Sequence, residues 1–168
     1  MLALLMSRVQ RPSPQVALAP PASARRIRSM LSYAMVALGS ALGGLARYGV
    51  TLIASHWLGD ALPWGTIFIN ASGSFVSGLF ATLTSPDGRL LVRSDTRAFV
   101  MVGICGGYTT FSSFSLQTLT LLQAHAWLAA GANVVLSMVL CLLAVWTGHI
   151  SAAAINRPPS GRKRAART

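Results

Sequence analysis

Four long apolar stretches dominate this sequence and leave few choices of fold. They cover about Leu31–Ala54, Trp64–Thr84, Ala98–Leu122 and Ala126–Ile150. Each is about 20 residues or longer, which is the length that an α-helix needs to cross the hydrocarbon core of a bilayer. A backbone surrounded by lipid must satisfy its own hydrogen bonds, so single spanning segments are helices. The sequence therefore predicts an all-α integral membrane protein with four transmembrane helices.

The charged residues lie at the ends of these stretches. Only 10% of the residues are charged, and all but one of the 14 Lys and Arg residues fall in the two chain ends or in the loop 85–97. Basic residues concentrated on one side mark the cytoplasmic face of a membrane protein. The formal charge of +11 does not indicate nucleic-acid binding, because no compact basic face with aromatic stacking positions is visible. We expect a multi-pass protein of the plasma (inner) membrane.

The composition divides the chain into three parts. Residues 1–29 are rich in Pro and Arg, which predicts a disordered basic N-terminal extension, and Met30 is an alternative start. Residues 30–151 contain the four apolar stretches and form the membrane domain. Residues 152–168 are predicted to be a disordered basic tail.

Several kinds of chemistry are missing from the membrane region. The three acidic residues, Asp60, Asp87 and Asp95, all fall in loops, and the chain has no Glu. Proton-coupled transporters usually place a carboxylate inside the membrane, so a coupled small-ion transporter is the weaker alternative. Cys105 and Cys141 lack metal-ligand spacing. No nucleophile lies beside a base, and we expect no enzyme activity.

The third apolar stretch contains the most unusual run of residues. The pair Gly106-Gly107 predicts a break in the helix, and the hydroxyls of Thr109 and Thr110 can cap the helix that follows. A broken helix frees carbonyl oxygens that suit a cation. The spacing of Phe111 and Phe114 puts both rings on one helix face. The positive edges of these rings suit an anion, and the alternative is that the two rings only pack a hydrophobic core.

The other polar residues of the spans leave alternatives open. Arg47 either extends toward the headgroups or is a buried cation. Asn70 either holds helices together or lines a pore. Asn133 and Ser137 share one face of the fourth stretch because they are four residues apart. A scaffold subunit without transport activity is a further alternative, although it would not explain the clustered hydroxyls and phenylalanines.

Three motifs together resemble a known family. They are Gly43-Gly-Leu-Ala-Arg-Tyr48, Gly65-Thr-Ile-Phe-Ile-Asn-Ala-Ser-Gly-Ser-Phe75 and Gly103-Ile-Cys-Gly-Gly-Tyr-Thr-Thr-Phe-Ser-Ser-Phe-Ser115, in this order on the first three spans. From about Leu31 to Ile150 the chain closely resembles the CrcB/Fluc family of fluoride channels. The resemblance implies a passive, fluoride-selective channel that exports fluoride from the cytoplasm.

The resemblance also implies an assembly and a set of site residues. The assembly is an antiparallel dimer of the dual-topology type, with a structural sodium ion at its centre. The sodium would bind backbone carbonyls of Gly106 and Thr109, and Arg47 would have a structural or electrostatic role. The fluoride pathway would include Asn70, Phe111, Phe114, Asn133 and Ser137.

The chain departs from the family pattern in two places, and its charge raises a further question. Ala129 stands where many members have Tyr, and Gln117 where many have Glu, so each leaves one polar contact in doubt. The strong charge bias predicts one fixed orientation. The dimer would then be a heterodimer with an oppositely oriented homologue, and otherwise a homodimer.

Overall fold

The computed structural model describes residues 22–57 and 62–157, and these are helical apart from short connections. The chain divides after Met30 into two units. In the first unit the described residues are the beginning of a helix, in which the Ser29 hydroxyl donates to the Arg26 carbonyl at 2.8 Å. The second unit, from Leu31 onward, contains all the elements discussed below.

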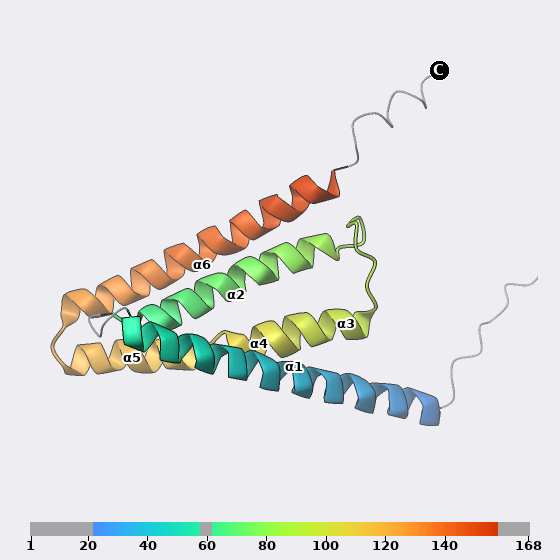
Figure 1. Ribbon diagram of the computed structural model, residues 1–168, viewed down its shortest axis with the longest axis horizontal. Helices are drawn as coiled ribbons and strands as arrows, with labels where there is room; N and C mark the ends of the chain where they lie inside the picture. The colour runs from blue at the N-terminus through green and yellow to red at the C-terminus, as the bar shows by residue number, and fades with distance from the viewer. Residues whose placement is uncertain (1–21, 58–61, 158–168) are drawn as a thin grey trace, which may run out of the picture. The chain divides into compact units, whose positions relative to one another are not determined.

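Seven helical elements follow one another along the described chain (Figure 1). The first is α1, which continues from the first unit into the second, and the fourth is a π-helix labelled η1. Their bounds are α1 Ala22–Trp57, α2 Trp64–Leu83, α3 Ser94–Ala98, η1 Phe99–Cys105, α4 Gly106–Tyr108, α5 Phe111–Gln123 and α6 Trp127–Asn156.

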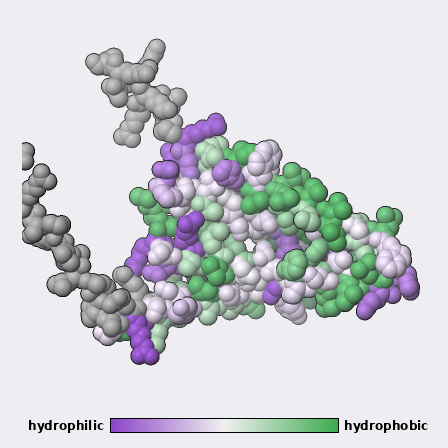
Figure 2. Space-filling view, turned by 180° about the vertical axis from the view of Figure 1, so that it is seen from behind, coloured by the Kyte–Doolittle hydropathy of each residue, from purple (hydrophilic) through white to green (hydrophobic). Residues whose placement is uncertain are grey.

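Four segments are long and apolar enough to cross a membrane, as the sequence predicts. The third of them is not one helix but the series α3, η1, α4 and α5. On much of the face shown in Figure 2, hydrophobic residues are exposed, which suits a surface in contact with lipid. The segments are Ser29–Trp57, Trp64–Leu83, Ser94–Gln123 and Trp127–Asn156.

Glycines allow close contacts between helices. A Cβ atom at Gly43 would collide with the Ile104 carbonyl oxygen, and one at Gly107 would collide with the backbone of Ser40. Along the pair α2 and α6, a Cβ at Gly78 would collide with the Val145 carbonyl. Small residues at such crossings bring backbones together in membrane proteins, where packing rather than water drives helix association.

The predicted position of the helix break is wrong, and two helices extend beyond the predicted limits of the membrane domain. Gly106 has φ −64° and ψ −37°, so the glycines are helical, and the extended backbone falls instead at Thr109 and Thr110. Helix α6 continues to Asn156, which puts the beginning of the tail later than residue 152. Helix α1 begins at Ala22, within the predicted disordered extension. The rest of both predicted tails, 1–21 and 158–168, lies outside the described residues.

Candidate functional site

The interruption between α4 and α5 is the centre of the candidate site. Thr109 has φ −76° and ψ 158°, and Thr110 has φ −151° and ψ 118°. Both conformations are extended, so the chain makes a short non-helical step between two helices. Inside a membrane such a step persists only if other groups satisfy its backbone.

Asn70 on α2 forms hydrogen bonds with both the N–H and the carbonyl group of Thr110. Its Nδ2 donates to the Thr110 carbonyl at 3.0 Å, and its Oδ1 accepts from the Thr110 N–H at 2.8 Å. The amide thereby takes the place of a neighbouring peptide group. Asn70 therefore joins α2 to this step, and its role in lining a pore stays a prediction. One of its two N–H bonds is still left for another acceptor.

The Thr110 side chain caps α5, as the sequence predicts. Its Oγ1 accepts from the Ser113 N–H at 3.2 Å. The same oxygen lies 3.1 Å from Ser113 Oγ and 3.2 Å from Ser112 Oγ. Three hydroxyls therefore gather at the first turn of α5. An N-cap of this kind satisfies one of the N–H groups that a helix leaves free at its beginning.

Phe111 and Phe114 begin the wall of a hollow beside this step. Their ring centroids are 5.6 Å apart and their planes are tilted by 43°. Phe111 is 79% exposed, whereas Phe114 is partly buried. The hollow has a volume of about 520 Å³. It is lined by Asn70, Ser74, Ser77, Thr109, Thr110, Phe111, Phe114, Ser137, Met138, Cys141, Leu142 and Val145.

Four of the five predicted pathway residues therefore line one hollow, whereas the fifth, Asn133, does not line it. Asn133 is fully buried, and its Nδ2 donates to Thr118 Oγ1 at 2.8 Å. Its Oδ1 accepts the Ser137 hydroxyl at 3.4 Å, which is a long contact. Asn133 thus joins α6 to α5 behind the hollow, while Ser137 reaches the wall.

The non-helical step also leaves two carbonyl groups without their helical hydrogen-bond donors. In a continuous helix, Gly106 O would accept from the Thr110 N–H, but this donor is bound to Asn70. Thr109 O would likewise accept from the Ser113 N–H, which is bound to the Thr110 side chain. Both carbonyl oxygens are therefore released from their helical donors, and they are the two that the family resemblance selects for a cation.

Arg47 is not part of the wall of this hollow. It is partly exposed on α1, and its carbonyl accepts the Thr51 hydroxyl at 2.9 Å. Within residues 22–57 and 62–157, its guanidinium has no hydrogen bond or ion pair, so neither alternative proposed for it is decided.

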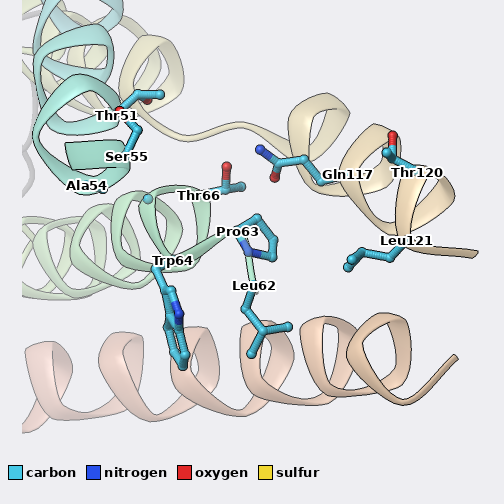
Figure 3. Close-up of a pocket in the computed structure, with 11 residues that line it drawn as sticks. Thr51, Ala54, Ser55, Leu62, Pro63, Trp64, Thr66, Gln117, Thr120 and Leu121 are labelled. Atoms are coloured by element: carbon cyan, nitrogen blue, oxygen red, sulfur yellow. The ribbon is translucent and has the colours of Figure 1, made fainter. Parts of the chain in front are cut away.

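A second hollow, of about 290 Å³, lies at the other half of α5. The Gln117 side chain extends from α5 toward Thr66 and Pro63 (Figure 3). Gln117 Oε1 is buried, and no described group hydrogen-bonds to it. The amide oxygen therefore has no partner among the described residues, and the effect of Gln at this position stays a prediction.

Two serines of the first wall were not among the predicted site residues. Ser74 and Ser77 follow Asn70 at four and seven residues, so the three share one face of α2. This spacing was visible in the sequence and is the signal that would have selected them. In the described part of the chain, neither hydroxyl has a hydrogen-bond partner, which leaves both facing the hollow with an unused donor.

Comparison with known proteins gives consistent matches. The profile of the family described as CrcB-like protein, Camphor Resistance (CrcB), matches residues 34–149. A protein of Paramagnetospirillum magneticum named "Fluoride-specific ion channel FluC" is 61% identical over 76% of this chain and all of its own length. Its namesake in Rhodospirillum rubrum is 57% identical over 75% of this chain and 98% of its own. "Fluoride-specific ion channel FluC 1" of Bradyrhizobium diazoefficiens is 51% identical over 82% and 95%.

Proposed function

Because this chain belongs to the CrcB/FluC family of membrane channels, which are not enzymes, we propose that it passes fluoride out of the cytoplasm without coupling to another ion. The observation that carries the proposal is the hollow beside the Thr109–Thr110 step. Its wall combines amide, hydroxyl and aromatic groups, and none of its residues is acidic. A pathway of neutral donors binds an anion weakly enough to release it.

The wall offers donors that are not used by the protein. One N–H of Asn70 remains after the bond to Thr110, and the hydroxyls of Ser74 and Ser77 have no partner among the described residues. The rings of Phe111 and Phe114 add positive edges. Together these groups replace part of the water that a small anion loses on entering the membrane.

A sodium ion on the carbonyls of Gly106 and Thr109 completes the proposal. Carbonyl oxygens are hard ligands, and both are free of their helical donors. The described residues contain no cluster of His, Cys, Asp or Glu that would hold a metal ion instead. One chain supplies two such oxygens, so a second subunit is needed to complete the site. When bound, the sodium would supply positive charge beside the anion path and would join the Thr109–Thr110 steps of the two subunits.

The exposed apolar surface supports a dimer. Phe111, Val102 and Leu116 are 79%, 61% and 65% exposed in the single chain. The antiparallel arrangement brings the two steps together at the centre, as either a homodimer or a heterodimer with an oppositely oriented homologue. Reporter fusions at the C-terminus distinguish them. A single cytoplasmic orientation supports the heterodimer, and comparable signals from both sides support the homodimer.

Efflux from liposomes tests the function. Purified protein should release fluoride far faster than chloride, with no dependence on a proton gradient. Replacing Phe111 or Phe114 with Ile should reduce the flux about tenfold or more while the dimer still forms. Leu119→Ile is the matched control, since Leu119 is on the same helix and lines neither hollow. Equal chloride flux, or a strict proton requirement, would overturn the proposal.

A further inference from the structure

The connection between α2 and α3 contains an unusual run, Arg89-Leu-Leu-Val-Arg93. Its three apolar residues are consecutive, and they have no helical or strand structure around them. Leu90, Leu91 and Val92 are nevertheless 47%, 87% and 36% exposed. The arginines on both sides are exposed as well. Contiguous apolar exposure of this kind indicates a surface that is covered by something other than water.

Hydrogen bonds hold this run against the ends of two spanning helices. Leu90 N–H donates to the Leu83 carbonyl at 3.1 Å. Asn156 accepts from the Arg89 N–H at 3.0 Å and donates its own Nδ2 to the Thr82 carbonyl at 2.9 Å. One amide at the end of α6 therefore joins the end of α2 to the beginning of the run, which lies beside the end of α6 (Figure 1). The three apolar residues of the run therefore lie at the level where α2 and α6 end.

The same hydrogen bonds bring the backbones of two arginines close to each other. Arg89 is bound to Asn156, and Arg157 is the next residue of that chain end. Both are exposed, and neither has an ion pair among the residues described. Arg93 differs, because it lies 3.5 Å from Asp95, which also accepts the Ser32 hydroxyl at 2.6 Å. The other nearby carboxylate, Asp87, is exposed and forms no ion pair in this part of the structure.

We propose that this run lies in the bilayer interface and binds an anionic phospholipid. Leu90, Leu91 and Val92 enter the outermost acyl region, while Arg89 and Arg157 bind the phosphate of the headgroup. Basic residues beside apolar anchors give this behaviour, and each arginine near an anionic surface contributes about a fivefold preference. A second copy of the chain is a poorer occupant, because its equivalent surface carries the same positive charge. The proposal concerns lipid and is independent of the ion that the channel passes.

Photo-crosslinking in liposomes of equal phosphatidylcholine and phosphatidylglycerol tests this binding. A benzophenone amino acid replaces Leu91, and mass spectrometry identifies the adduct. With two arginines contributing about fivefold each, we expect phosphatidylglycerol adducts to exceed phosphatidylcholine adducts by about 25-fold. The same probe at Leu128 is the control, since Leu128 is 89% exposed at the opposite ends of the spans, where the sequence has no Arg or Lys. Its adducts should show no headgroup preference.

Charge variants identify the residues that cause the preference. Arg89→Gln and Arg157→Gln should each reduce the phosphatidylglycerol preference about fivefold, and Arg89→Lys should retain most of it. Size-exclusion chromatography of each variant in detergent establishes that the protein is folded, whichever ion it passes. Adducts to a second copy of the chain, equal adducts of both lipids at position 91, or no lipid adducts there would overturn the proposal.

Discussion

Two polar residues of the α5 region differ in whether their groups have hydrogen-bond partners. At its beginning, the backbone and side chain of Thr110 all have partners, supplied by Asn70 and by the first turn of the helix. At its middle, Gln117 reaches a smaller hollow with a buried Oε1 that has no partner among the described residues. The first arrangement fixes a backbone shape that a membrane would otherwise not tolerate. The second arrangement fixes no backbone shape, so removing the polar group of Gln117 should not destabilise the protein.

Loss of Asn70 should have the largest effect. Asn70→Ala leaves both the N–H and the carbonyl of Thr110 unpaired, and we expect a loss of about 2–4 kcal/mol in the free energy of unfolding. Fluoride flux should fall with it, because the step between α4 and α5 loses its shape. Denaturation of the purified protein in detergent measures the stability, and liposome efflux measures the flux.

Ser74→Ala is the control for Asn70→Ala. Ser74 lies one turn further along the same face of α2, but no described residue bonds to its hydroxyl. Its loss should change the unfolding free energy by about 0.5 kcal/mol or less. Equal destabilisation by the two variants would mean that the amide does not hold the step.

Asn133→Ala should come next in size. Asn133 is fully buried, and its amide donates to Thr118 across the contact of α5 and α6. Truncation leaves a cavity and an unpaired acceptor, for which we expect about 2–3 kcal/mol. A double-mutant cycle with Thr118→Val, measured by denaturation, should give a coupling of about 1 kcal/mol. Simple additivity would show that the hydrogen bond contributes nothing.

Thr110→Val tests the hydroxyl that caps α5. The variant keeps the backbone bonds to Asn70 but loses the oxygen that accepts from the Ser113 N–H and contacts the Ser112 and Ser113 hydroxyls. We expect a loss of about 1 kcal/mol, which is typical of an N-cap. Thr120→Val is the matched control on α5, because its hydroxyl bonds only the Leu116 carbonyl of its own helix. If both variants cost the same in thermal unfolding, the cap has no special role.

The features that the sequence predicts well are those that depend on neighbouring residues. The four spans follow from apolar length, and the Thr110 cap follows from a hydroxyl placed before a helix. The position of the break was wrong because it depends on Asn70, which is 40 residues away in the chain. Gly106 and Gly107 remain helical, and Gly107 serves instead for close contact with Ser40 on α1. The unpaired Gln117 oxygen likewise depends on helices that pack around it, which local patterns do not show.

Gln117→Met should change the stability in the opposite direction to the other variants. Met keeps the length of the side chain but removes a buried acceptor that has no described partner. Burying such a group unpaired is unfavourable, so we expect the variant to be about 1 kcal/mol more stable. Denaturation in detergent, beside Asn70→Ala, makes the comparison direct. A clear loss of stability would mean that the Gln117 oxygen is bound, by water or by a ligand in the smaller hollow, and that Gln117 resembles Thr110 in having a partner.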